Sequence, residues 1–255
     1  MNKRYYNQSS ILFVKHRKKK LINQIKKIIM NNFKKEEEFY LNMKLERFRK
    51  IVLRTQNQIY KKNISYELVK LLENEIKNYL EEDGFYFQSH LYLRATRPEK
   101  YSVNQSDNVG WHRERFYGKN GFGAVNIWTP ILNVNKKNTL RFIPKSQNIS
   151  QSKIKIKKEK NPYTQKNSAG HKVGLLYAPK IIMSGVNLKN SMPMTVPYYQ
   201  SAIFNGDLIH GAAINNSSKI RFSVDMRIMP KNKWKSNSNK FHVSNSKKYY
   251  IEFKK

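Results

Sequence analysis

Five short runs of aromatic and β-branched residues follow Gly84, and their succession constrains the fold more than any other feature of the sequence. Each run is bounded by Gly, Asn or Pro, which is typical of strands joined by turns. The runs span residues 85–93, 123–131, 139–143, 200–204 and 220–228. This pattern predicts an α+β, mainly β chain whose later part is an antiparallel sandwich or jelly roll.

Apolar residues recur at helical spacing in two stretches before Gly84. The positions are Ile22, Ile25, Ile29 and Phe33 in the first stretch, and Leu68, Leu72, Ile76 and Leu80 in the second. Ser65 is placed to cap the second helix. We predict that these N-terminal helices pack on the outside of the β-core. Periodicity alone does not distinguish this bracing role from a dimer interface, so the oligomeric state stays open.

Composition divides the chain into three parts. Residues 1–84 are predicted to form a basic helical N-terminal segment, residues 85–230 the β-rich core, and residues 231–255 a basic polar tail in which residues 249–253 could add a last strand. Residues 145–197 show little pattern and contain many lysines. We expect them to form a long basic excursion over the mouth of the core.

The charge is strongly positive, with 50 Lys and Arg against 17 Asp and Glu, a formal net charge of +33. Only 12 of the 50 cations are Arg, and Asn and Ile are abundant as well. A surface built to bind phosphates usually favours Arg, whose planar fork matches the phosphate group. We therefore interpret the charge mainly as part of the Lys, Asn and Ile bias that is typical of an AT-rich genome. Nucleic acid remains an alternative partner that we do not favour.

The absence of cysteine excludes disulfide scaffolds, zinc ribbons, iron-sulfur clusters and cysteine nucleophiles. Any metal must therefore bind to His, Asp or Glu. The early apolar run at residues 11–14 is too short for a signal peptide, and no run approaches the length of a membrane span. We expect a cytoplasmic protein.

Two histidines and one carboxylate are candidate metal ligands. His112 and Glu114 are two residues apart, and in a strand such residues point to the same face. His210 follows 98 residues after His112, just beyond the turn-like Asn205-Gly206-Asp207. Two His and one carboxylate with open positions are the ligand set that non-haem Fe(II) oxygenases use. A His-x-Glu sequence alone is a weak signal, because it is more often a surface pair.

The last strand of the core strengthens this interpretation. Its apolar residues alternate with Arg221, Ser223, Asp225 and Arg227, so one face is apolar and the other polar. Arg221 stands 11 residues after His210 and, if buried, would need a carboxylate such as Asp225 or a bound dicarboxylate. The alternative is an outward-facing row of ion pairs.

Four motifs together resemble those of a known family. They are W-H-x-E-x-x-Y at residues 111–117, N-x-W at 126–128, L-R-F-I-P-x-S at 140–146, and H-G-x-x-x-N-x-S-x-x-x-R-x-S-x-D-x-R at 210–227. The chain resembles the Fe(II)- and 2-oxoglutarate-dependent oxygenases of the phytanoyl-CoA dioxygenase-like group, in particular its bacterial biosynthetic branch. The resemblance covers residues 85–230.

The resemblance implies a double-stranded β-helix (jelly-roll) core and an enzyme that couples oxidative decarboxylation of 2-oxoglutarate to hydroxylation, or a related C–H oxidation, of a small metabolite. By the resemblance, His112, Glu114 and His210 bind Fe(II), to which 2-oxoglutarate and O2 also bind. It further implies that Arg221 pairs with the distal carboxylate of 2-oxoglutarate and that Asn126 contacts the cosubstrate. All five side chains are therefore predicted to converge.

The chain departs from the family pattern at two positions. Glu114 stands where the family most commonly has Asp, and its extra methylene lengthens the reach of the carboxylate. Halogenating relatives have a small residue there, so the carboxylate favours hydroxylation or a related oxidation. Ala212 stands where many relatives have a hydroxyl that helps to hold the cosubstrate.

Two other functions are compatible with the sequence. One is a basic nucleic-acid-binding module in which the jelly roll is only a scaffold, and the other is a cupin-like metal protein without a cosubstrate. If the chain is an oxygenase, Arg94, Arg97 and the lysines of residues 153–160 favour an anionic substrate.

Trp111 and Trp128 are predicted to pack in the core. The remaining histidines have no carboxylate at metal-ligand spacing: His16, His90, His171 and His242.

Overall fold

The computed structural model describes residues 9–101, 110–116, 121, 123–158, 180–212, 214–234 and 250–254. Within these residues the α-helices all precede Gly84. They are α2 (Lys20–Asn32), α3 (Glu37–Leu41), α4 (Leu45–Lys61), α5 (Ile64–Leu71) and α6 (Glu73–Leu80). His171, His242 and most of the predicted polar tail lie outside the described residues.

The larger of the sheets has seven strands, all antiparallel to their neighbours. Its order is β1-β9-β4-β11-β2-β12, and β3 pairs with β11 next to β2. The strands are β1 (Ile11–Lys15), β2 (Phe85–Gln88), β3 (Tyr92–Thr96), β4 (Val125–Leu132), β9 (Gln200–Asn205), β11 (Arg221–Pro230) and β12 (Tyr250–Glu252). The ten-residue β11 is therefore paired along both of its edges.

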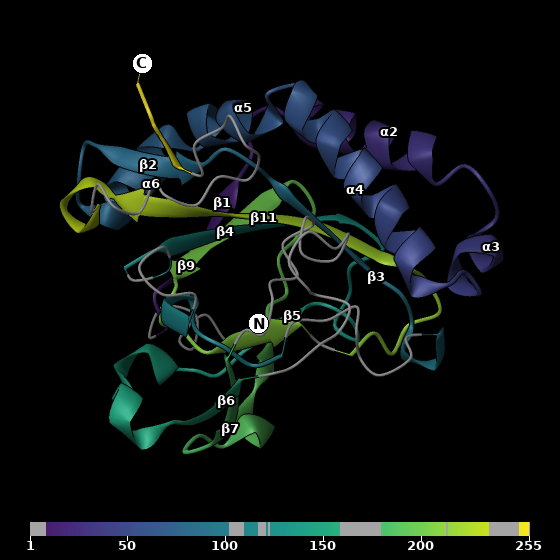
Figure 1. The fold of residues 1–255 in the computed structure, drawn as a ribbon. Coiled ribbons are helices and arrows are strands. Elements are labelled where there is room, and N and C mark those ends of the chain that lie inside the picture. Colours follow the sequence, from purple (N-terminus) through teal and green to yellow (C-terminus); the bar gives the residue numbers. More distant parts are fainter. Residues whose placement is uncertain are drawn as a thin grey trace.

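A smaller sheet lies below the large one in Figure 1 and has the order β10-β5-β8. Its strands are β5 (Leu140–Phe142), β8 (Met192–Pro193) and β10 (His210–Ala212). The strands β6 (Lys155–Lys158) and β7 (Lys180–Ser184) form a separate two-stranded sheet. The predicted excursion at residues 145–197 thus contains strands of its own in its described part.

An apolar core joins the helices to the outer face of the large sheet. Ile25 and Ile29 of α2 and Leu68 of α5 pack in one cluster with Ile127 of β4 and Val224 of β11. Figure 1 shows α2, α4 and α5 lying across this face. The helices therefore brace the sheet, which is the first of the two roles left open by the sequence. Whether they also form a dimer interface stays open.

A second apolar cluster fills the space between the two sheets. It contains Trp128 and Phe204 from the large sheet and Leu140, Phe142 and Met194 from the small sheet and the residues beside it. The fold is thus three layers, with helices, the large sheet and the small sheet in that order. Strand β4 is covered on both faces, because all its residues except the last are buried.

The mixture of helices and antiparallel sheets confirms the α+β prediction, but several details differ. The second predicted helix is interrupted at Leu72, so it forms α5 and α6. Ser65 lies inside α5 and its hydroxyl donates to the carbonyl of Ser89, so the prediction that it caps the helix is wrong. The predicted last strand is present as β12. Among the described residues, no helix has the length and apolar character that a membrane span needs.

Candidate active site

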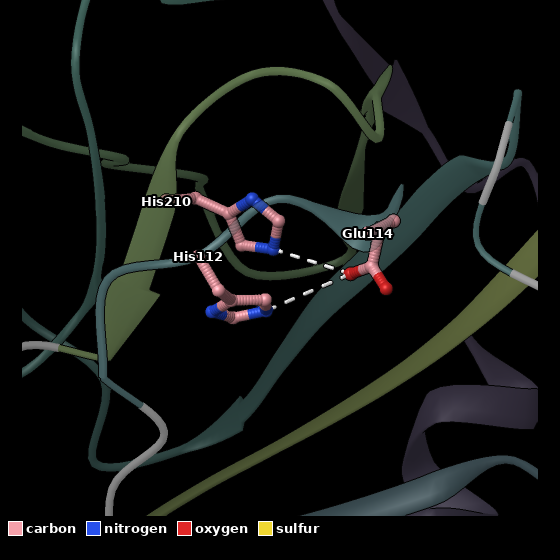
Figure 2. A group of neighbouring side chains, drawn as sticks. All are labelled: His112, Glu114 and His210. Atoms are coloured by element: carbon pink, nitrogen blue, oxygen red, sulfur yellow. Dashed lines mark ion pairs between the residues drawn. The ribbon is translucent and has the colours of Figure 1, made fainter. Parts of the chain in front are cut away.

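His112, Glu114 and His210 converge, and each comes from a different local structure (Figure 2). His210 begins β10, and His112 forms an isolated bridge to it, with backbone hydrogen bonds of 2.9 and 3.1 Å in the two directions. Glu114 begins a single 3-10 helical turn at residues 114–116, and its N–H donates to the carbonyl of Gly206 at 2.8 Å. The expected strand through His112 and Glu114 is therefore wrong, although the two side chains do point to the same place.

The three side chains are buried and close together. One ligand atom from each of His112, Glu114 and His210 lies within 4.8 Å of the other two. Oε1 of Glu114 is 3.3 Å from Nε2 of His210 and 3.8 Å from Nε2 of His112. In the described part of the chain, no other group of three His, Cys, Asp or Glu is arranged in this way.

Hydrogen bonds determine which nitrogen of each imidazole faces the cluster. Nδ1 of His112 contacts the carbonyl of Gly110 at 2.7 Å, and Nδ1 of His210 contacts the carbonyl of Leu208 at 2.8 Å. A carbonyl only accepts, so each Nδ1 carries a proton and each ring turns Nε2 toward the cluster. Two imidazole nitrogens and a carboxylate oxygen thus face one another, and these are the donor atoms of a metal site.

The charge of Glu114 is stabilised inside the protein. Burial raises the pKa of this carboxyl, but Arg227 and the two imidazoles outweigh burial and hold the pKa well below its usual range. Arg227 forms an ion pair with Oε2, and Nδ2 of Asn126 donates to Oε1 at 3.0 Å. Burial lowers the pKa of His112, His210 lowers it further, and Glu114 opposes both. The cluster therefore pairs an ionised carboxylate with a neutral His112 near pH 7.

A glycine allows the close approach of Glu114 to the chain before β10. A Cβ atom on Gly206 would lie 2.9 Å from both Cβ and Cγ of Glu114 and 2.5 Å from the carbonyl oxygen of Ala124. The φ of Gly206 is outside the left-handed region, so the restriction is steric rather than conformational. The ring of Phe204 meets that of His210 edge-on, with centroids 5.1 Å apart.

The polar face of β11 points into the space between the sheets. Arg221, Ser223 and Arg227 are buried, and the alternate residues of β11 pack in the core beneath the helices. The alternative of an outward-facing row of ion pairs is therefore wrong. Asp225 pairs with Arg94 of β3, whose Nε and Nη2 donate to the two carboxylate oxygens at 2.6 and 3.0 Å.

Arg221 is a buried cation that makes no ion pair among the described residues. Its Nη2 donates to Oγ1 of Thr96 at 2.7 Å, while its Nε is buried without a hydrogen-bond acceptor. Burial lowers the pKa of Arg221 to about 10. The nearby Arg94 lowers this pKa further, whereas Asp225 raises it. A buried guanidinium is costly unless an anion pairs with it, so the position is suited to an anionic ligand.

The other candidates have structural surroundings. His90 stacks on Tyr60 with centroids 4.0 Å apart, and Nε2 of His16 contacts Oγ of Ser201 at 2.7 Å. Nη1 of Arg97 donates to the carbonyl of Met43 at 2.7 Å. Trp128 is buried between the sheets and Trp111 is partly buried, as predicted for core residues.

Arg113 and Arg115 hold the chain around the cluster. Nη2 of Arg113 donates to the carbonyls of Ser146 and Ile149, and Arg115 forms an ion pair with Asp207 in the turn that precedes β10. Sequence reasoning missed these roles and also the pairing of Arg227 with Glu114. The alternation of β11 was the only signal for Arg227, because it placed this residue on the same face as Arg221.

The chain is similar to a known protein family and to solved structures. The sequence profile of a family described as "Phytanoyl-CoA dioxygenase (PhyH)" matches residues 19–223, well over half of the chain. No curated protein matches in sequence. Among solved structures, AviO1 from Streptomyces viridochromogenes Tue57 is 13% identical, covers 89% of this chain and 93% of its own, and gives a TM-score of 0.51, which indicates a shared fold.

A second similar structure is described as the epimerase SnoN in complex with Fe3+, alpha ketoglutarate and nogalamycin RO. It is 10% identical, covers 89% of this chain and 81% of its own, and has a TM-score of 0.49.

Proposed function

The chain belongs to the phytanoyl-CoA dioxygenase family, and on that premise we propose that His112, Glu114 and His210 are its iron ligands and that Arg221 binds 2-oxoglutarate. The protein is a non-haem iron oxygenase that uses Fe(II), 2-oxoglutarate and O2 and oxidises a small metabolite. Family membership supports this function over a nucleic-acid-binding module or a cupin-like protein without a cosubstrate. The residue roles are the part that needs a test.

The observation that carries the ligand assignment is the set of electron-pair donors at the cluster. Nε2 of His112, Nε2 of His210 and Oε1 of Glu114 face one another, and each can give an electron pair to one cation. Two His and one carboxylate leave three positions of a six-coordinate iron for other ligands. The residues present therefore fit Fe(II).

Arg221 fits the distal carboxylate of 2-oxoglutarate. Its guanidinium is buried on the inner face of β11, and Asp225, the carboxylate that sequence reasoning offered as its partner, pairs with Arg94 instead. Thr96 supplies a hydroxyl beside Arg221, which could bind the same carboxylate. We also retain Asn126 as a contact to the cosubstrate, because its amide lies against Glu114 and, at 3.4 Å, against Nε2 of His210.

The sheets that carry these residues support the proposed double-stranded β-helix. One wall of that barrel would be the large sheet with Asn126 and Arg221, and the other would be the small sheet with His210. We keep residues 1–84, 85–230 and 231–255 as the proposed segments. The N-terminal segment shares its apolar core with the barrel, so we expect the two to unfold together.

The chain's own residues position the reactants. Bound Fe(II) and 2-oxoglutarate supply the oxidising chemistry, in which O2 is consumed, succinate and CO2 are released and a substrate C–H bond is oxidised. His112 and His210 each keep one lone pair directed at the cluster, because the proton of Nδ1 is held by a backbone carbonyl. The apolar side chains of Trp128 and Phe204 exclude water from the space between the sheets.

The substrate is proposed only as a class. Arg94 and Arg97 were expected to favour an anionic substrate, but Arg94 pairs with Asp225, and Arg97 binds backbone carbonyls. An anionic substrate is therefore supported only by the exposed lysines of β6 and the residues before it, Lys153, Lys155 and Lys157. We propose hydroxylation or a related C–H oxidation, and a cytoplasmic location.

An anaerobic titration tests the residue roles. The purified protein is loaded with Fe(II), 2-oxoglutarate is added, and the visible charge-transfer band of the chelated cosubstrate is followed. We expect a saturable band that is lost in His112→Ala and His210→Ala, together with Fe(II)-dependent succinate formation. His16→Gln is the matched control, because His16 is also buried but lies outside the cluster. A band that persists in His210→Ala would remove the ligand assignment.

A further inference from the structure

The two oxygens of Glu114 face different groups. Oε1 is directed at the imidazoles, 3.3 Å from Nε2 of His210 and 3.8 Å from Nε2 of His112. Oε2 lies against Nε of Arg227, and the contact is an ion pair rather than an aligned hydrogen bond. Both side chains of this pair are more than nine-tenths buried. A carboxylate divided in this way presents one oxygen to the cluster and keeps the other on the arginine.

The two side chains that contact the carboxylate oxygens of Glu114 lie on neighbouring strands of the large sheet. Arg227 of β11 and Asn126 of β4 are directly opposite each other in the antiparallel pair, and Asn126 donates to Oε1 while Arg227 faces Oε2. The N–H of Arg227 donates to Oε1 of Gln88 at 2.8 Å. Both contacts therefore come from residues whose backbones are fixed in one pair of bonded strands.

Resting on the ligand assignment above, we propose that Arg227 is a positioning residue that holds Oε2 of Glu114 away from the metal, so that Glu114 binds iron through Oε1 alone. This matters because three protein atoms leave three positions on a six-coordinate iron. The cosubstrate needs two of these positions and O2 needs the third. A second oxygen from Glu114 would occupy one of them.

The glutamate explains why an arginine is useful here. A glutamate has one more rotatable bond than the aspartate common in the family, so its carboxylate can turn more freely and bring both oxygens to one ion. The ion pair with Arg227 restricts that rotation. It also neutralises part of the negative charge, so Glu114 is a weaker donor to the metal than a free carboxylate would be.

Three variants test the proposal. Arg227→Met removes the charge and keeps most of the volume, and Arg227→Lys keeps the charge but loses the planar fork. Arg49→Met is the control, because Arg49 is equally buried but lies on α4, outside the site. The affinity for Co(II) is measured first without cosubstrate, from the visible spectrum of the bound ion. The affinity of the Fe(II)-loaded protein for 2-oxoglutarate is then measured anaerobically.

We expect Arg227→Met to bind Co(II) at least as tightly as the wild type, with an altered Co(II) spectrum, and to bind 2-oxoglutarate roughly 10- to 100-fold more weakly. Arg227→Lys should recover part of the 2-oxoglutarate affinity, and it is the test variant if Arg227→Met does not fold. Arg49→Met should match the wild type in both affinities.

Three results would overturn the proposal: unchanged 2-oxoglutarate affinity in Arg227→Met, equal losses of metal and cosubstrate affinity, or loss of metal affinity alone. Failure of the ligand assignment itself has a different signature. In that case the wild type would bind Co(II) no better than His210→Ala does, whatever the behaviour of the Arg227 variants.

Discussion

Replacement of Gly206 by alanine should disturb the proposed metal ligands without touching any of their polar atoms. Gly206 lies in the turn between β9 and β10, where its N–H donates to the carbonyl of Ala124 and its carbonyl accepts from the N–H of Glu114, both at 2.8 Å. The residue is therefore held between the start of β4 and the turn that carries Glu114. A methyl group added to Gly206 would therefore collide with the atoms around it.

The expected size of the effect follows from the contacts. The methyl carbon would lie 2.5 Å from the oxygen of Ala124 and 2.9 Å from Cβ and Cγ of Glu114. The favourable contact distance between non-bonded carbon atoms is about 3.5 Å or more. The neighbouring atoms must therefore move by roughly 0.5 to 1 Å to make room for the methyl group. Overpacking of this kind costs about 1 to 3 kcal/mol, and the midpoint of thermal unfolding falls by roughly 2 to 4 °C per kcal/mol.

The side chain of Glu114 yields more easily than the hydrogen-bonded backbone of Ala124. Metal–ligand distances tolerate about 0.2 Å, so a shift of half an ångström should lower metal affinity roughly tenfold or more. Co(II) titration and thermal unfolding of Gly206→Ala measure the two effects. Gly211→Ala is the control, because its methyl group would meet Trp111 at an ordinary 3.4 Å directly beside His210. Equal Co(II) affinity in the two variants would refute the reasoning.

Three further predictions rest on single side chains. Arg221→Met should weaken 2-oxoglutarate binding roughly tenfold or more and leave Co(II) affinity unchanged, by the two titrations above; weakened Co(II) binding would contradict the assignment. Arg97→Met should lower the free energy of unfolding in urea by about 1 to 3 kcal/mol, because buried carbonyls lose their donor, and should leave 2-oxoglutarate affinity intact. Burial lowers the pKa of His16 from 6.5 to about 4, so the unfolded chain binds a proton between these values that the folded chain does not. Stability should therefore fall as pH drops through this window, and urea unfolding of His16→Gln should show a smaller decrease.

The sequence predicts the polar row of β11 because a strand has a period of two and this strand is regular. The alternation therefore places Arg221 and Arg227 on the inner face without any knowledge of the rest of the fold. It does not predict their partners. Glu114 is more than a hundred residues from Arg227, and the pairing depends on a turn that local propensity did not indicate.

Helix α4 shows a different limit. This helix is not among those predicted from the sequence, although Phe48, Val52 and Ile59 keep helical spacing. Its buried face also includes Arg49, Thr55 and Gln56. One of them, Gln56, accepts from the N–H of Leu93 at 3.0 Å. The apolar period could therefore have predicted this helix, whereas the partners of its buried polar residues lie on strands that follow much later in the chain and could not be predicted from it.

The distribution of charge inside the protein differs from that on its surface. The formal charge of +33 comes mainly from lysines and indicates no particular partner. Between the sheets, however, the charges are nearly matched: Arg227 pairs with Glu114 and Arg94 pairs with Asp225. This pairing leaves the positive charge of Arg221 beside the hydroxyl of Thr96. An anion that enters can therefore pair with Arg221 without breaking an existing ion pair, whereas Glu114 stays paired with Arg227. In the proposed function, the same strand thus supplies both the arginine that orients Glu114 and the arginine that binds the cosubstrate.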